Sequence, residues 1–590
     1  MTLENFSYAH FGWLGRGLNK ILRGIERDLD AADMKMYHEV YLSLIGFFSI
    51  VSLSVPIALT LVFAIGFWPE MPFLPMNGLF LIPATIFLPL IIIGIGAILP
   101  KFSASNRVNG LKIEIPYASM YISVMTSGGL SPYQSILRMQ NMDLMPNMRR
   151  EVKRIERIRL STGVDPLSAM EHAAKVVNLS EYKELLLGYA SSVRTGGDTL
   201  HYLYNQTNNM FRRLSVKVKS MGENMGVLME AYNIVGILGV LGLFLIFVVG
   251  LSLPSASVGI SPEQFFLFSF IVLPVMSIVF IYFGDAIQIS YPVSNFKTYI
   301  VSLATVPFAL IMASQMVLPF FDESFLVFPP LHEAILSLRV IFRLAEGTEP
   351  ALGLTLTLLI VALPSFIADQ YIMGRERSLQ EGITSFLRDL VEIRKSGLSP
   401  ERCIDALASR DYKSFSKHLK MINMKLNWGY PIREIYREFK SKVRNWLALI
   451  NIYLLIDTIE VGGGTEESLE TLAEFAESTR ELENEKKSTL MPLTIVPYIG
   501  AALLTGSTVI FLQFFTSMGT MGVSVQTVTL YKILLTPLVI HSFILGLVTG
   551  KIVTGRISAG FKHAIFLTIV ALAGVYAVSN MSMGSITGGI

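Results

Sequence analysis

Apolar stretches long enough to cross a membrane recur along the whole chain. Nine of them lack Asp, Glu, Lys and Arg, and about 20 apolar residues are enough to span a bilayer core of roughly 30 Å. They are residues 41–67, 78–99, 231–253, 264–283, 298–321, 350–368, 490–515, 533–549 and 564–580. The pattern predicts an all-α polytopic membrane protein with about nine transmembrane helices.

Two long polar segments interrupt these runs, and each is expected to form a cytoplasmic bundle of about six helices. In the first segment, Val152, Ile155 and Ile158 recur at helical spacing, and strand-like alternation is scarce. The predicted organisation is a cytoplasmic amphipathic segment (1–40), transmembrane helices 1–2 (41–99), a first bundle (100–230), transmembrane helices 3–6 (231–368), a second bundle (369–489) and transmembrane helices 7–9 (490–590).

The two polar segments share landmarks in the same order, which indicates an internal duplication. A Gly-Leu-Ser-Pro motif is followed by a Gly-Gly pair, and the intervals from the proline to that pair are 64 and 63 residues. The landmarks are Gly129, Pro132, Gly196 and Gly197 in the first segment and Gly397, Pro400, Gly463 and Gly464 in the second. Each repeat unit has one span before its polar segment and three after it, and this even number of spans per unit leaves both copies in the same orientation, so the repeat is parallel. We interpret the glycines as structural turns, since neither pair follows a strand or leads into a Walker lysine.

The distribution of Lys and Arg predicts the orientation. The short loops 68–77, 254–263 and 516–525 contain neither Lys nor Arg. By contrast, loop 284–297 contains a Lys, and loop 551–563 contains both Lys and Arg. Lys and Arg accumulate in cytoplasmic loops. We therefore expect the N-terminus and both bundles in the cytoplasm and the C-terminus outside the cell membrane.

The N-terminal segment has its own amphipathic pattern. Its apolar residues share one helical face: Leu14, Leu18, Ile21, Leu22, Ile25 and Leu29. Such a helix can lie on the inner membrane surface or, equally well, against the first bundle. The sequence leaves both placements open.

Composition excludes several classes of protein. Only 16% of the residues are charged, against about 25% in ordinary soluble proteins. The net charge of +3 does not suit a nucleic-acid-binding polyelectrolyte. A single cysteine, Cys403, excludes an intramolecular disulfide and a cysteine-based metal site.

No pattern in the sequence predicts catalytic, cofactor-binding or metal-binding residues. Gly550-Lys551 lacks the upstream glycines of a P-loop, and His541 is a lone titratable group within a span. Asp198 follows a Thr-Gly-Gly sequence that only superficially resembles the Gly-x-Gly-Asp motif of intramembrane proteases. Asp285 and Asp369 lie at span edges and are interpreted as boundary residues.

The first bundle carries a concentrated basic stretch. Segment 100–230 has 17 basic and 11 acidic residues, a net charge of +6. Six of the basic residues crowd into positions 149–159: Arg149, Arg150, Lys153, Arg154, Arg157 and Arg159. This stretch could dock a large acidic partner or could simply be a solvated face. In the second segment, 375–444 is basic and 457–485 holds ten acids and one Arg.

With these landmarks the chain resembles the tandem F-domain membrane platforms of type II secretion and type IV pilus systems. Nine spans and the closing motif from Gly555 to His563 resemble the archaeal branch, which serves archaella and adhesive pili; bacterial members have about three spans. The resemblance implies a non-enzymatic homodimer that couples a hexameric secretion ATPase to pilin or archaellin subunits, without nucleic acid. A transporter or channel with regulatory cytoplasmic domains is the first alternative, and a membrane protease the second.

Overall fold

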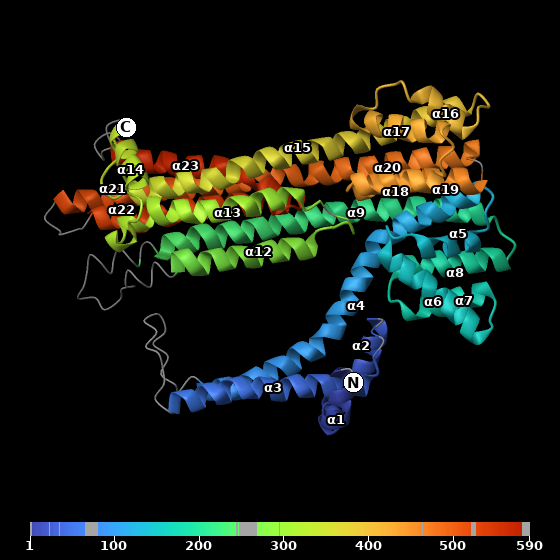
Figure 1. The fold of residues 1–590 in the computed structure, drawn as a ribbon, viewed down its shortest axis with the longest axis horizontal. Helices are drawn as coiled ribbons and strands as arrows, with labels where there is room; N and C mark the ends of the chain where they lie inside the picture. Colours follow the sequence, from blue (N-terminus) through green and yellow to red (C-terminus); the bar gives the residue numbers. More distant parts are fainter. Residues whose placement is uncertain are drawn as a thin grey trace. The chain divides into compact units, whose positions relative to one another are not determined.

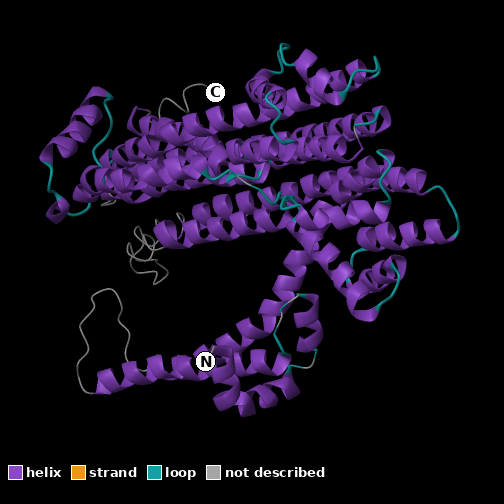
Figure 2. Cartoon of the chain, turned by 45° about the vertical axis from the view of Figure 1, so that its right-hand side comes forward, coloured by secondary structure: helices purple, strands orange, loops and turns teal. Residues whose placement is uncertain are grey.

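The chain was analysed as a computed structural model that describes residues 3–22, 24–32, 34, 36–64, 81–243, 246, 268–293, 295–462, 464–520 and 527–580. Every regular element in these ranges is helical, as Figure 2 shows, which confirms the predicted all-α class. The chain divides into two compact units. Unit 1 comprises residues 1–123 and 131–207, and unit 2 comprises residues 124–130 and 208–590.

Seven described helical stretches are long and apolar enough to cross a membrane. They are Thr199–Leu243, Phe268–Ile287, Lys297–Phe320, Glu349–Arg394, Glu466–Thr516, Thr527–Thr554 and Ile557–Asn580. These stretches overlap the last seven predicted spans, of which 231–253 and 264–283 also extend into residues that lie outside the described ones. The first two, 41–67 and 78–99, extend into residues 65–80, which lie outside the described residues. Their described parts belong to α3 (His38–Ala64) and α4 (Leu81–Ser127).

In unit 1 the N-terminal helices pack against α3. Helices α1 (Leu3–Ile21) and α2 (Ile25–Ala31) bury Leu18 and Leu29 in one cluster with Leu42 and Ile45. The hydroxyl of Tyr41 donates to the carbonyl of Gly96 at 2.8 Å and ties α3 to α4. The amphipathic face therefore packs on the first predicted span. Its placement on the inner membrane surface stays a prediction.

The first polar segment holds six α-helices, as predicted. The C-terminal half of α4 is followed by α5 (Pro132–Arg138), α6 (Pro146–Thr162), α7 (Pro166–Val176), α8 (Ser180–Arg194) and α9 (Thr199–Asn233). The side chains of Ser131 and Asp165 cap α5 and α7, each accepting a backbone N–H, and a proline follows each cap. Leu111, Ile115 and Ile155 are fully buried in this part of the chain.

Unit 2 contains the second bundle and the described spans that follow α9. Its remaining helices are α12 (Leu273–Ile287), α13 (Lys297–Met316), α14 (Pro329–Ile341), α15 (Glu349–Arg394), α16 (Pro400–Leu407), α17 (Ser416–Asn427), α18 (Ile432–Lys442), α19 (Trp446–Gly462), α20 (Glu466–Leu490), α21 (Ile495–Thr520), α22 (Thr527–Thr554) and α23 (Gly560–Asn580). In Figure 1 the long helices α13, α15, α22 and α23 run side by side. The α22–α23 pair packs closely: a Cβ at Gly546 would lie 2.2 Å from the backbone of Ala564.

The first helix of each polar segment is not a short one. α4 has 47 residues and α15 has 46, and each passes from an apolar run into its polar segment as one helix. In α15, Pro364 lies inside the helix without ending it. Each bundle is thus joined to the preceding apolar helix by continuous helical backbone rather than by a loop.

The turn between α22 and α23 is fixed to other helices of unit 2 by polar contacts. Lys551 forms an ion pair with Asp285 at the end of α12. Asp369 of α15, which is buried, accepts a hydrogen bond from Ser558 at 2.8 Å and lies 3.8 Å from Arg556. Asp369 is therefore a structural partner of the closing motif, and Asp285 is a partner of Lys551 just before it, in agreement with their interpretation as boundary residues.

Left-handed glycines mark equivalent turns in the two polar segments. Gly129 and Gly397 have φ values of 94° and 86°, and Gly196 and Gly464 have 69° and 62°. Both pairs are 268 residues apart, as are Pro132 and Pro400. Gly196 therefore corresponds to Gly464. Gly463 lies outside the described residues, and Gly197 has no positive φ.

Replacement of Gly464 by Ala should destabilise the second bundle. In the left-handed region, the conformational free energy of a residue with a Cβ is about 1–2 kcal/mol less favourable. The new Cβ would also lie 2.7 Å from Cγ of Pro400. Gly429→Ala is the matched control, since its φ is 76° and nothing lies within 4 Å of its added Cβ. We expect a larger fall in Tm for G464A than for G429A. Equal falls would show that the contact with Pro400 has no energetic role.

Candidate docking surface

The basic stretch of the first bundle lies on α6, an amphipathic helix. Met148, Val152 and Ile155 are fully buried on one face. The helix ends at Gly163, whose φ of 68° forms a left-handed C-cap and whose N–H bonds the carbonyl of Arg159. The apolar face thus anchors α6 in the bundle and directs much of its charge toward the surface.

Glu114 of α4 holds the N-terminal end of α6. Its buried carboxylate accepts hydrogen bonds from the backbone N–H of Met148 at 2.6 Å and of Asn147 at 3.2 Å. These amides have no partner within the helix. Burial raises the pKa of Glu114 to about 7, although these hydrogen bonds and the nearby charge of Arg150 favour the ionised form. The position of α6 therefore depends on a carboxyl that titrates near neutral pH.

The six basic residues separate into two groups. Arg150, Lys153 and Arg157 are exposed at positions i, i+3 and i+7, so they share one face, and none forms an ion pair within the described residues. We call these three residues the α6 basic face.

The other three basic residues have local roles. Arg149 pairs with Asp143 at 2.5 Å, and Arg159 pairs with Glu156 at 2.6 Å. Arg154 is half-buried, and its Nη1 has no hydrogen-bond partner in the described part of the chain. The charge available to a partner is therefore about half of what the sequence suggested.

An open hollow of about 410 Å³ adjoins the α6 basic face. Lys153, Arg157 and Leu160 line it, together with Gln140, Glu156 and Ser161. The side chain of Leu160 is 68% exposed. Cations around an exposed apolar residue suit a protein partner that carries acidic groups around an apolar contact.

The second bundle exposes an aromatic counterpart that the sequence reasoning missed. On α17, Lys417, Lys420 and Met424 share a face that leads to Trp428, which is 65% exposed. Lys425 lies 4.9 Å from the ring centroid of nearby Tyr430. Exposed Trp is typical of binding hot spots. A tryptophan directly before the helix-ending Gly429, in a polar segment, is the signal that could have revealed this surface.

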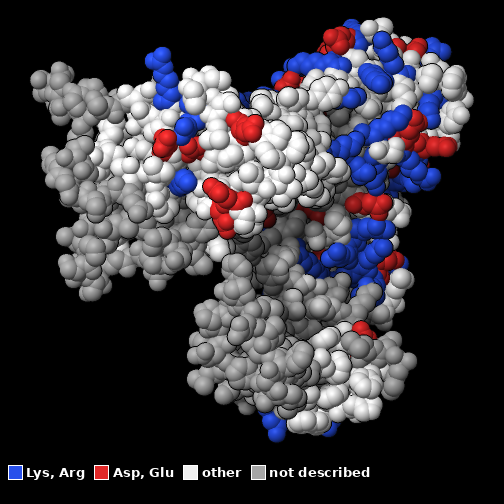
Figure 3. Space-filling view, turned by 60° about the vertical axis from the view of Figure 1, so that its left-hand side comes forward, with Lys and Arg blue, Asp and Glu red and all other residues white. Residues whose placement is uncertain are grey.

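Several cations of the second bundle are paired internally. Arg388 of α15 and Lys395 directly after it form ion pairs with Glu477 and Glu470 of α20, and Arg433 forms one with Glu460 at 2.6 Å. At these three cations, ion pairs connect the basic stretch 375–444 to the acidic stretch 457–485. Figure 3 shows charged side chains crowding the bundles while the visible spans are nearly free of them.

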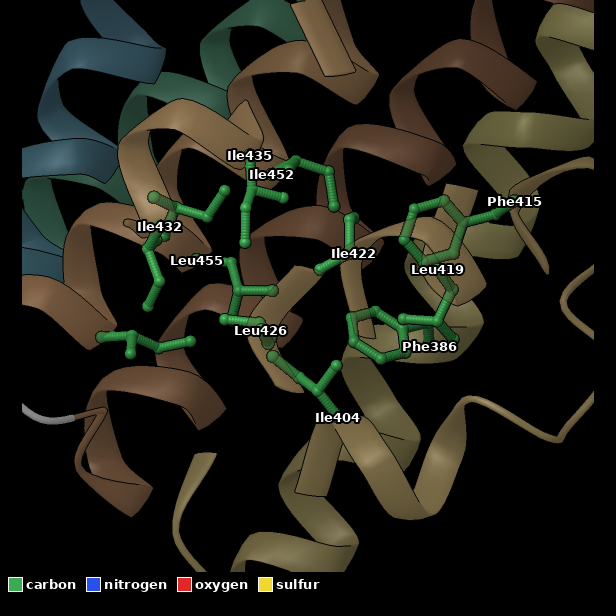
Figure 4. A pocket seen from close by; sticks show the side chains of 12 residues that line it. Phe386, Ile404, Phe415, Leu419, Ile422, Leu426, Ile432, Ile435, Ile452 and Leu455 are labelled. Atoms are coloured by element: carbon green, nitrogen blue, oxygen red, sulfur yellow. The ribbon is translucent and has the colours of Figure 1, made fainter. Parts of the chain in front are cut away.

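The enclosed space in the second bundle is core rather than a ligand site. Figure 4 shows it surrounded by apolar side chains such as Phe386, Phe415 and Ile452. Its volume of about 20 Å³ is that of a single water molecule at most. Among the described residues no three His, Cys, Asp or Glu side chains come together in a way that could hold a metal ion.

The remaining candidates for chemistry have structural partners. His541 is buried, stacks 6.4 Å from the ring of Tyr232 and lies beside Gly236. Asp198 caps α9 by accepting the backbone N–H of His201 at 3.0 Å. In the described structure, His541 is engaged in packing and Asp198 in capping.

Comparison with known proteins finds one domain twice in this chain. The family model for protein F of the type II secretion system matches residues 118–247 and 386–513. The two matches begin 386 − 118 = 268 residues apart, the same interval that separates Pro132 from Pro400. The duplication inferred from the landmarks is thereby confirmed.

A full-length comparison finds a distant relative. An uncharacterized protein of Methanocaldococcus jannaschii is 20% identical over 508 residues, which cover 81% of this chain and 82% of that protein. No solved structure matches the chain significantly.

Replacing Glu114 by Gln should flatten the pH dependence of stability. The folded-state pKa of about 7 exceeds the ordinary value of 4.5. The stability contributed by the neutral carboxyl is therefore fully present when the pH is below the ordinary pKa of Glu. It is lost as the pH rises through the folded-state pKa. Thermal unfolding of the purified protein should show falling stability between about pH 5 and pH 8, with a weaker fall in E114Q. If stability falls equally steeply with pH in the wild type and in E114Q, Glu114 does not have this role.

Proposed function

We propose that this chain, in which the domain of protein F of the type II secretion system occurs twice, is a membrane platform of secretion- and pilus-type machinery that couples a cytoplasmic hexameric ATPase to the insertion of pilin subunits into a filament. F-domain platforms are non-enzymatic, and we assign no catalytic role to this chain. The main observation that supports the proposal is that α4 and α15 are each one continuous helix, which runs from an apolar stretch into a bundle. Such a helix can transmit movement of a bundle to the membrane.

The α6 basic face and the α17 surface around Trp428 are the proposed contacts with the ATPase. Both lie on bundle helices, both are exposed, and both combine cations with an apolar side chain. The competing interpretation of the α6 basic face is a solvated helix. It accounts for the charge but not for the exposed Leu160 beside it.

We further propose that the platform serves an archaeal filament, either an archaellum or an adhesive pilus, as a homodimer. The nine predicted spans, the closing motif and the relative in Methanocaldococcus jannaschii support this assignment. The Lys- and Arg-free loops 68–77, 254–263 and 516–525 support a cytoplasmic N-terminus and an extracellular C-terminus. Pilin or archaellin subunits would then reach the apolar surfaces of the spans.

Replacing Arg150 and Arg157 by Glu should weaken ATPase binding and should make that binding less sensitive to salt concentration. Exposed ion pairs are each worth about 0–1 kcal/mol, so several must change together. Arg154 is left unchanged because its Nη1 is buried. The matched control reverses Lys175 and Arg212, exposed cations on α7 and α9. Pull-down with the ATPase at two salt concentrations would measure the effect. Equal binding by both folded variants would place the docking surface elsewhere.

Insertion of two glycines after Gly374 in α15 should abolish filament assembly while leaving ATPase binding intact. The glycines interrupt the helix between apolar run and bundle, and glycine costs about 1 kcal/mol each in a helix interior. The control inserts the same pair after Arg410, between α16 and α17. Filament counts by electron microscopy and ATPase pull-down would be compared. Normal filaments in the α15 variant would contradict mechanical coupling through this helix.

A further inference from the structure

A second basic hollow lies on unit 1, where α4, α6 and the end of α7 meet. Its volume is about 330 Å³. It is lined by α4 between Ala104 and Lys112, by Arg154 of α6 and by residues 176–178 after α7. It is separate from the hollow beside Leu160, and neither the F-domain match nor the proposed ATPase contacts account for it.

Three cations line this hollow, and two of them, Lys112 and Arg154, form no ion pair within the described residues. Arg107 pairs with Glu151, whose other oxygen accepts a hydrogen bond from Tyr182 at 3.5 Å. Arg154 Nη1 is buried with no hydrogen-bond partner among the described residues, and no ion pair of Lys112 is found there. A buried N–H of a charged group without an acceptor is costly, so the site favours an added anion.

The side chains in the hollow suit a phosphate group. A guanidinium presents a planar fork of donors that matches phosphate oxygens, and a lysine adds a point charge. Ser105, Asn109 and Asn178 also line the hollow and carry neutral donors. The single carboxylate nearby, Glu151, is occupied by Arg107 and Tyr182.

The position along α4 favours a phosphate that belongs to a lipid. The predicted span ends at Leu99 and the lining begins at Ala104 on the same helix. Five residues of helix advance about 7 Å, which is close to the thickness of one head-group layer, about 5–7 Å. On the span side of the hollow, Phe102 is 50% exposed, and Val176 at the rim is 49% exposed.

We propose that this hollow binds the phosphate of an anionic phospholipid head group. The inference depends on α4 crossing the membrane, but not on the ATPase or on filament assembly. The bound phosphate would join α4, α6 and α7 at the membrane surface. The apolar side chains Phe102 and Val176 would contact the lipid beside its head group, which a free phosphate does not need.

The test uses the full-length protein in detergent with short-chain phosphatidylglycerol as the probe. Phosphatidylcholine and inorganic phosphate are the comparison ligands. Native mass spectrometry would count bound lipid, and thermal unfolding would measure stabilisation. We expect phosphatidylglycerol to bind and to raise Tm more than either comparison ligand. Stabilisation by inorganic phosphate equal to that by the lipid would overturn the lipid assignment.

The Lys112→Gln, Arg154→Gln double variant should weaken phosphatidylglycerol binding by about tenfold or more, because it removes charge-assisted hydrogen bonds. The matched control is Lys153→Gln with Arg157→Gln, which removes two exposed charges from the same domain and should bind as the wild type does. Equal binding by both variants would overturn the site.

A lipid-free measurement separates binding from a structural role. Because Arg154 Nη1 has no partner, the double variant should unfold at the same temperature as the wild type, or higher, without lipid. Marked loss of stability or failure to fold in the lipid-free state would show that Arg154 supports the bundle itself, and would also overturn the proposal.

Discussion

A peptide group in hydrocarbon has to find its hydrogen-bond partner within its own helix, and this constraint organises the whole chain. Once a span is helical, extending it into water is easy, since each added residue brings one hydrogen bond and no new nucleation cost. α4 and α15 continue in this way from apolar runs into polar segments. Each bundle is thus attached to a membrane helix by continuous helical backbone, although α4 has Pro100 at this junction, where a proline removes one hydrogen bond from the helix interior.

The same constraint determines where polar contacts between spans can form. The nine apolar runs contain no charged residue, so ion pairs gather at helix ends. Lys551 with Asp285, and Asp369 with Ser558, join α12 and α15 to the turn between α22 and α23. The closing motif that suggested a family from the sequence therefore links helices of unit 2.

Much of the fold could be predicted because its signals are local. Runs without charge mark helices in a membrane, and a left-handed turn favours glycine whatever its surroundings. What could not be predicted depends on partners distant in sequence. Arg388 and Glu477 are 89 residues apart in the sequence. The sequence around either residue therefore does not indicate that the two charges are paired. Arg154 and Arg157 look alike in the sequence, and only packing makes one half-buried and the other exposed. Gly196 and Gly197 differ in the same way: the two glycines are adjacent in the sequence, but only Gly196 adopts the left-handed conformation.

The two repeats have diverged in how they present their surfaces. The first bundle leaves Arg150, Lys153 and Arg157 without ion pairs among the described residues, whereas in the second Arg388 and Lys395 are paired with α20. The second bundle exposes Trp428 instead. Charge acts over distance and is screened by salt, while a buried aromatic contact acts only at close range. Under the proposed function, a partner that meets both bundles would be attracted mainly by the charge of the first and held mainly by the aromatic contact of the second.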